Sequence, residues 1–215
     1  MISEKVEGKK IKMIQKARTA ISNHFNKFPP KIRVFLLRIL IMFVAWKFIY
    51  GFFLEPNRTL DNPLTMKVGS DVAWVLTKMT SNNNFQAAAR ISDKWFEGKR
   101  YFTPVTRIEY KGQKLMHIAD GCNGLELFVL YIGFIFAIPA SLKRKLAFAI
   151  GGIVIIYVVN VLRCVGLAFV AINWQDQFDF AHHYLFKVIV YTIVFLLWVK
   201  FADKTFKEPV TQAPI

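Results

Sequence analysis

Three kinds of side chain in this sequence could together carry out acyl transfer: a thiol, a guanidinium and an imidazole. Cys122 lies in the stretch DGCNGLELF, just before an almost entirely apolar run, and Arg163 lies inside a later one. His182 and His183 stand at the start of another apolar run. A thiolate is a nucleophile, an imidazole moves protons, and a guanidinium can hold a carbonyl or a developing oxyanion. The residue types therefore suggest covalent catalysis by Cys122.

Each of these residues also has an ordinary structural interpretation. A cysteine near a helix start is usually a small packed residue, and a histidine doublet is a common polar boundary of a membrane segment. Arg163 is harder to explain in this way, because a charge in hydrocarbon is costly and is usually functional or paired. A structural pair of Arg163 with Glu126 is the simplest alternative. Co-location of all three kinds of side chain would favour catalysis.

Two neighbours are candidates for orienting the guanidinium. Asn160 and Arg163 are three residues apart, so they share one face of a helix, and Asn160 could hold the arginine in place. Glu126 could pair with Arg163 or with Lys187, or it could simply pack.

The remaining candidates flank the two cysteines. Gly121 and Gly124 would let a peptide backbone approach the Cys122 thiol closely, or they would shape the turn. Cys164 points about 100° away from Arg163 on an ideal helix, which favours a structural role.

Composition places the chain in a membrane. Of the 215 residues 54% are hydrophobic, 21 are Phe, and the apolar residues gather into runs of membrane-spanning length. The net charge is +15, but the basic residues mostly flank these runs, and no nucleic-acid-binding motif is present. Two Cys and four His form no recognisable metal-ligand cluster, so no metal or cofactor is predicted. The N-terminus has no cleavable-signal pattern, so the first apolar segment is expected to remain as an anchor.

The apolar runs predict an all-α integral membrane protein. The expected spans are 33–54, 125–140, 146–172 and 184–199. Basic residues at the N-terminus, in SLKRK (141–145) and in the tail place these segments in the cytoplasm, which requires an even number of crossings. The insert 55–121 and the loop 173–183 then lie outside. Within the insert, 66–79 is expected to form an amphipathic helix and 106–118 a β-hairpin that turns at YKGQ.

This arrangement brings the candidate residues to one depth. Cys122 lies at the outer end of the second span, and the two histidines lie at the outer end of the fourth. Arg163 is about 17 residues beyond the cytoplasmic start of the third span, roughly 26 Å along a helix. All three would therefore meet near the outer membrane surface.

These same residues carry a resemblance to the exosortase/archaeosortase family. DGCNGLELF resembles the family's nucleophile motif, NVLR (160–163) its Asn-x-x-Arg motif, and AHHYLFKVIVY (181–191) the histidine-bearing start of its final core helix. The resemblance covers about residues 115–200, with the Cys, Arg and His motifs in the family's order. The chain has fewer spans than many members.

The resemblance implies a membrane cysteine transpeptidase or protease. Cys122 would form a thioester, Arg163 would donate a proton or hold the oxyanion, and one of the two histidines would complete the site, with His182 fitting the spacing slightly better than His183. The implied partners are membrane lipid and secreted proteins that carry a C-terminal sorting signal, namely a short motif, a transmembrane helix and a basic tail. The implied location is a prokaryotic cytoplasmic membrane, with the site facing outward.

The expected organisation has five parts: a basic cytoplasmic arm (1–31), an anchor helix (32–54), an extracytoplasmic insert (55–121), a three-helix catalytic core (122–200) and a cytoplasmic tail (201–215). Two other functions stay open at this point. One is a non-enzymatic membrane scaffold or assembly factor, in which the Arg and His only join helices. The other is a thiol redox protein using Cys122 and Cys164, although these two cysteines form no CxxC motif.

Overall fold

The computed structural model describes residue 15 and residues 29–80, 84–96 and 99–207. The chain divides into two compact units, Met1–Ala45 and Trp46–Ile215. Helix α2 (Pro30–Ile49) continues as a π-helical turn, Tyr50–Leu54, so the predicted segment 33–54 is helical throughout. Most of the predicted basic arm at 1–31 and the end of the tail lie outside the described residues.

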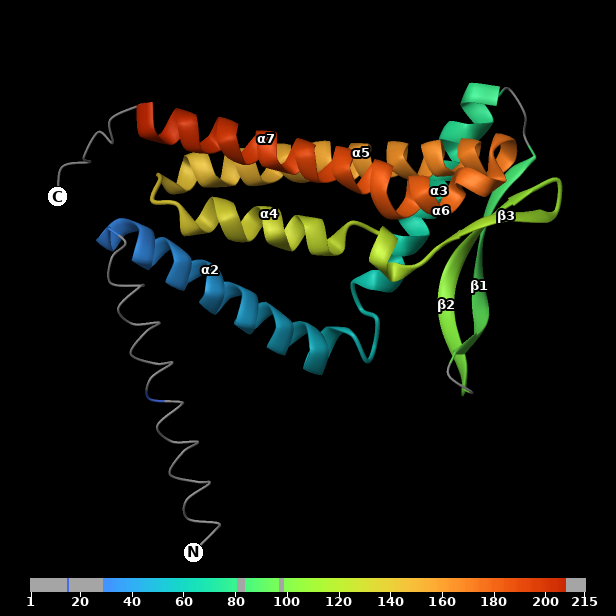
Figure 1. Cartoon of the computed structure of the whole chain (residues 1–215), viewed down its shortest axis with the longest axis horizontal. Coiled ribbons are helices and arrows are strands. Elements are labelled where there is room, and N and C mark those ends of the chain that lie inside the picture. The colour runs from blue at the N-terminus through green and yellow to red at the C-terminus, as the bar shows by residue number, and fades with distance from the viewer. Residues whose placement is uncertain (1–14, 16–28, 81–83, 97–98, 208–215) are drawn as a thin grey trace, which may run out of the picture. The chain divides into compact units, whose positions relative to one another are not determined.

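Three helices of the second unit form a bundle (Figure 1). They are α4 (Leu125–Ala137), α5 (Leu142–Asn173) and α7 (Phe186–Lys207). Helix α4 ends at Ala137 because Ile138 is extended ahead of Pro139. A short helix α6 (Phe178–Phe180) and a π-helical turn (Ala181–Leu185) lead into α7.

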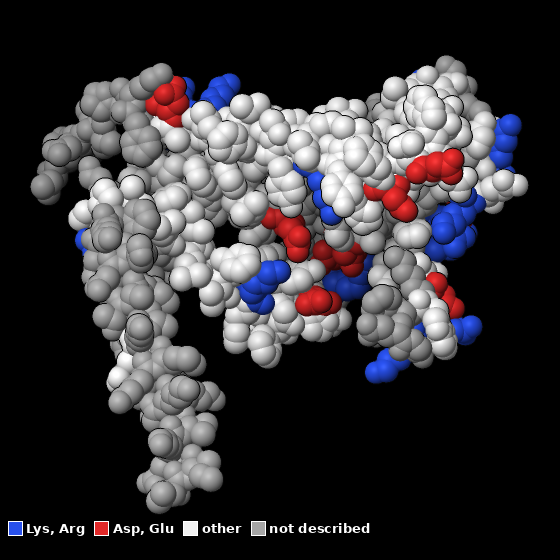
Figure 2. Space-filling model, in the orientation of Figure 1, with Lys and Arg blue, Asp and Glu red and all other residues white. Residues whose placement is uncertain are grey.

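Two helical segments of the described residues are long and apolar enough to cross a membrane, Leu142–Asn173 and the continuous stretch Gln175–Thr205. Helix α4 is apolar, but its 13 residues span only about 20 Å. Helix α2 is not among these segments, and its sequence carries four basic residues. Charged side chains gather beside α3 and the sheet, whereas most of the visible bundle face is uncharged (Figure 2). The four-span topology therefore stays a prediction.

The region between α2 and α4 folds into one helix and one sheet. Helix α3 (Asp61–Thr80) includes the predicted helix at 66–79. Strands β1 (Phe85–Phe96), β2 (Lys99–Tyr110) and β3 (Gln113–Ile118) form an antiparallel sheet in the order β1-β2-β3. The expected hairpin is β2–β3, and its turn places Lys111 and Gly112 at positive φ. Strand β1 and the first half of β2 were not predicted, because QAAAR lacks the alternation that marks a half-buried strand.

Helix α3, the sheet and the last third of α5 share one hydrophobic core. Its most buried members include Val68, Val72, Leu76, Ile108, Ile118, Cys164, Leu167 and Ala168. A Cβ on Gly69 would overlap the Thr106 methyl group, so glycine allows α3 to lie close against the sheet. With 32 residues, α5 is about 48 Å long, which exceeds a bilayer core of about 30 Å. The core packs against the C-terminal third of this helix.

A hydrogen bond also fixes α3 to α5. The Tyr157 hydroxyl of α5 donates to the Asp71 carboxylate of α3 at 2.6 Å, and Lys67 contacts the same carboxylate. Burial alone would raise the pKa of Asp71, but the hydrogen bonds from Lys67 and Tyr157 together hold it below its ordinary value. The contact lies one helical turn before Asn160, so α3 is attached to α5 next to the candidate site.

Candidate active site

The turn that carries Cys122 is built from the motif DGCNG. Residues Asp120–Cys122 form a single 3-10 turn, and α4 begins at Leu125. The side-chain oxygen of Asn123 accepts the Leu125 N–H at 2.8 Å, which satisfies one free donor at the start of the helix. Gly124 has φ of 89°, a conformation that side-chain-bearing residues rarely adopt. Asn and Gly therefore explain why the chain turns sharply here and presents the thiol ahead of α4.

The Cys122 thiol lies between an imidazole and a guanidinium. Its Sγ is 3.5 Å from Nε2 of His182 and 3.7 Å from Nη2 of Arg163, which donates toward it. The thiol is half-buried, whereas Arg163 is only 8% exposed. Side chains from two other segments thus contact the Cys122 sulfur atom. The three residues that were predicted to lie at one depth are therefore neighbours in the structure.

Asn160 joins the guanidinium to the nucleophile turn. Its amide nitrogen donates to the Cys122 carbonyl at 2.9 Å, and its oxygen accepts from Nη1 of Arg163 at 3.4 Å. Asn160 is fully buried. Among the described residues, Nε of Arg163 has no hydrogen-bond partner, so this buried cation retains an unused donor beside the thiol. The geometry gives Asn160 the orienting position that its spacing predicted.

The two histidines occupy different environments because they lie in a π-helical turn. The Phe186 N–H donates to the Ala181 carbonyl, five residues back, and such turns are frequent at functional sites. His182 stacks on Phe178, with ring centroids 5.9 Å apart, and faces the thiol. His183 is exposed and meets the His182 ring edge-on. Of the doublet, His182 is the residue positioned to exchange a proton with Cys122.

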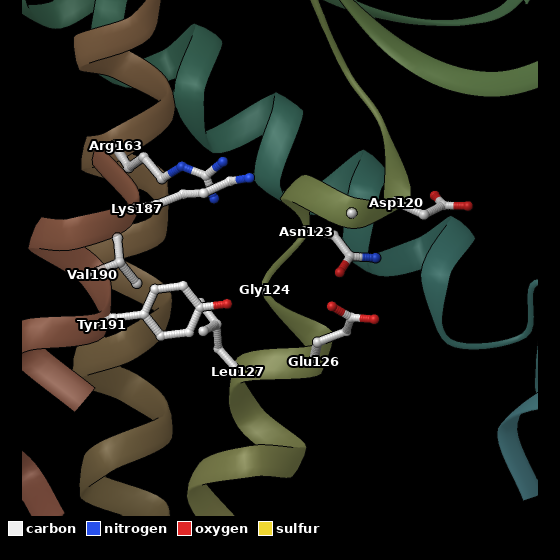
Figure 3. Close-up of a pocket in the computed structure, with 10 residues that line it drawn as sticks. Asp120, Asn123, Gly124, Glu126, Leu127, Arg163, Lys187, Val190 and Tyr191 are labelled. Carbon is white, nitrogen blue, oxygen red and sulfur yellow. The ribbon is translucent and has the colours of Figure 1, made fainter. Parts of the chain in front are cut away.

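A pocket opens beside this contact (Figure 3). Arg163 from α5 and Lys187 and Tyr191 from α7 line one side, and Asp120 and Glu126 lie on the other. The basic groups of Arg163 and Lys187 and the Tyr191 hydroxyl point into the space between them. A peptide entering here would meet polar groups on both walls next to the Cys122 turn.

Glu126 and Cys164 lie away from the contact between Cys122, Arg163 and His182. Glu126 is not paired with Arg163 or Lys187 in the described part of the chain; it is exposed and lies 4.0 Å from Nζ of Lys47. Glu126 lies in the first turn of α4, across the pocket from Arg163 and Lys187. Cys164 is 1% exposed within the core, and both cysteines are free, which supports its structural role.

The two glycines beside Cys122 are not equivalent. A Cβ on Gly121 would meet nothing within 4 Å, so this position leaves open space before the thiol. A Cβ on Gly124 would lie 3.3 Å from Nδ2 of Asn160, in addition to the strain of the positive φ. Gly124 therefore shapes the turn.

This difference gives a testable prediction. We expect Gly124→Ala to destabilise the protein by about 1–2 kcal/mol, the usual cost of a left-handed conformation for an L-residue. Gly121→Ala is the matched control and should leave stability unchanged. The measurement is thermal unfolding of each purified variant in detergent. Equal melting temperatures for the two variants would contradict the assigned role of Gly124.

Sequence reasoning missed a polar network behind the nucleophile turn. It consists of Tyr50, Arg58, Asp61, Thr65, Asp120 and Asn123. The polar stretch EPNRTLD offered a weak signal, but its partners are about 60 residues away, and no local pattern shows such pairing.

One comparison with known proteins identifies a relationship. Residues 29–199 match a family model described as transmembrane exosortase (Exosortase_EpsH). The match covers most of the chain and includes the segments that carry Cys122, Arg163 and His182. Neither a curated protein nor a solved structure matches the chain.

Proposed function

The chain belongs to the transmembrane exosortase family, and from this premise we propose that it is a cysteine transpeptidase or protease acting on sorting signals. Membership supports a membrane transpeptidase or protease at the level of the family. The proposal adds that Cys122 forms a thioester with secreted proteins at a C-terminal signal. The observation that carries it is the Cys122 thiol lying 3.5 Å from His182 and 3.7 Å from Arg163.

The proposed reaction has two halves. In the first, His182 takes the thiol proton, and Cys122 Sγ attacks the carbonyl carbon of the scissile peptide. The tetrahedral intermediate collapses when His182 returns the proton to the leaving amine, which leaves a thioester. In the second half, the acceptor gives its proton to His182 and attacks the thioester, and the Cys122 thiol regains the proton.

Arg163 suits the charge that develops during both halves. Its guanidinium lies beside the sulfur and keeps one donor unused among the described residues, and Asn160 holds it in position. A preorganised cation stabilises a thiolate and an oxyanion more strongly in a site that excludes water. We therefore assign Arg163 to the oxyanion, and Asn160 to its orientation.

The proposed substrates are secreted proteins that end in a short motif, a transmembrane helix and a basic tail. Large apolar side chains on the outward faces of α5 and α7 are exposed, among them Ile150, Val154, Val188 and Phe195. Such faces suit contact with lipid and with a substrate helix that diffuses in the same bilayer. The nucleophile turn would then meet the chain where it leaves the membrane.

The proposed topology places the site outside the cell. It has four spans, with the insert 55–121 and the nucleophile turn extracytoplasmic and both termini in the cytoplasm. Reporter fusions after Ala140 and after Lys200 should both report a cytoplasmic location. An external signal at either position would contradict this arrangement.

The histidine doublet provides a sharp comparison. We expect His182→Ala to reduce substrate processing by about a hundredfold or more, in the range of a general acid-base residue. His183→Ala should retain processing within a few-fold, because His183 is exposed and meets only the edge of the ring of His182, the histidine that contacts the thiol. Processing is measured in cells and normalised to protein level by immunoblot. Normal processing in both variants would remove the histidine from the mechanism.

The proposed function is tested by co-expression. Secreted proteins of the same genome that share a C-terminal motif, a helix and a basic tail serve as candidate substrates. Each is expressed with and without the chain, and its mass is measured after membrane extraction. A product lacking the C-terminal helix should appear only when the chain is present. Unprocessed protein for every candidate would contradict the proposal.

A further inference from the structure

We infer that Arg58 and Asp61 position the catalytic nucleophile. They do so through side-chain hydrogen bonds to Asp120 and Asn123, which lie on either side of Cys122 in the sequence. The inference rests on the proposed function and deepens it, because neither residue reaches the thiol. Arg58 lies three residues before α3, and Asp61 is the first residue of that helix. They act through Asp120 and Asn123, which are two residues before and one residue after Cys122.

Arg58 holds the first half of the turn. Its Nε donates to one oxygen of Asp120 at 2.9 Å and its Nη2 to the other at 2.6 Å, and Nη2 also donates to the Pro104 carbonyl at 3.3 Å. Thr65 adds a third donor to Asp120, at 2.9 Å. The arginine and aspartate side chains are only 22% and 27% exposed, unlike an ordinary surface pair. The two parallel bonds fix orientation as well as distance.

Asp61 holds the second half of the turn. Asn123 is 1% exposed, and its amide nitrogen donates to Asp61 at 2.9 Å and to Thr65 at 3.2 Å. The Tyr50 hydroxyl donates to the other Asp61 oxygen at 2.8 Å. The Asn123 oxygen meanwhile accepts the first N–H of α4. Every polar atom of the Asn123 side chain is thereby bound to a fixed element.

On the other side of the turn, the Asn160 amide of α5 donates to the Cys122 carbonyl at 2.9 Å. Gly121 meets no neighbour that a Cβ would touch, and Cys122 is half-buried. The position of the thiol relative to His182 therefore depends on Asn160 and on the hydrogen bonds that hold Asp120 and Asn123. A displacement of about 1 Å of a reacting group can lower a rate about a hundredfold. Loss of the Arg58 fork should accordingly reduce turnover without weakening substrate binding.

The test compares turnover and binding in purified full-length protein in detergent, with the processed secreted protein as substrate. We expect Arg58→Ala to lower kcat about 10- to 100-fold, with KM within about twofold of wild type. Arg58→Lys should be intermediate, because it keeps the charge and loses the fork. Arg107→Ala is the matched control, since it removes an arginine that pairs with Glu109 in the sheet and leaves the turn intact.

A second arm separates positioning from general stability. Arg58→Asp combined with Asp120→Arg should recover at least tenfold in kcat over Arg58→Asp alone. Wild-type kcat in Arg58→Ala, or an equal loss in Arg107→Ala, would overturn the inference. If Arg58→Ala does not fold, Arg58→Lys decides between the same outcomes. Cys122→Ala in the same assay tests the proposed function separately: continued processing there refutes the function, whereas an inactive Cys122→Ala beside a fully active Arg58→Ala refutes only the positioning role.

Discussion

Cys122→Ala will lower substrate processing by about a thousandfold or more, because it removes the atom that forms the thioester. The remaining groups, Arg163, His182 and Asn160, can still bind a carbonyl, but they offer no covalent route. Cys122 is only half-buried and packs at the edge of the hydrophobic core, so alanine should cost little stability. The measurement is the ratio of processed to unprocessed substrate in cells at matched protein level.

The second cysteine supplies the control for this prediction. Cys164 is 1% exposed and belongs to the core shared by α3, the sheet and α5. Cys164→Ala should therefore retain processing within a few-fold while lowering the melting temperature slightly. Full processing in Cys122→Ala would instead favour a scaffold. Equal losses in both variants would favour thiol redox chemistry.

Arg163→Lys should lower kcat/KM on the order of a hundredfold, although the positive charge is kept. The loss expected for a single oxyanion donor is of this size, and a lysine has neither the planar fork nor the length to reach both Asn160 and the thiol. Arg163 is 8% exposed, so the replacement also places a strongly hydrated ammonium in a buried position. The loss of the fork acts on the transition state more than on substrate binding.

The matching control lies on the same helix. Arg144 sits near the start of α5 and donates to the Lys204 carbonyl, far along the helix from the thiol. Arg144→Lys should therefore leave kcat/KM within about twofold. A comparable loss in both arginine variants would show that the effect is not specific to the site, and normal activity in Arg163→Lys would exclude a role for the fork.

Several features of the fold were predictable because they depend on local chemistry. The long apolar runs predicted α5 and α7, and Pro139 explains where α4 stops. The turn of the β2–β3 hairpin needs positive φ, and Gly112 supplies it at one of the two positions. Strand β1 could not be predicted in the same way, because its alanines do not alternate with polar residues, and Ala87 packs against a core that includes residues of α3.

The sequence predicted the level of the site residues along the helices, but not which of their side chains face one another. Counting residues along the spans placed Cys122, Arg163 and the histidines at one level, but it could not say which side chains face each other. The family spacing favoured His182 only slightly over His183, because the contact of His182 with the thiol depends on a π-helical turn that changes the helical register and has no sequence signature. The Arg58–Asp120 pair joins residues 62 positions apart, so it emerges only from the folded chain.

The most direct test of the account is to isolate the acyl-enzyme. Purified protein is mixed with substrate, quenched in acid within the first turnover, digested and analysed by mass spectrometry. We expect the peptide containing Cys122 to carry the substrate's C-terminal acyl group, to lose it on treatment with hydroxylamine, and to be unmodified in the Cys122→Ala variant. Product that accumulates while Cys122 stays unmodified at every time point, or an acyl group on another residue, would contradict covalent catalysis by Cys122.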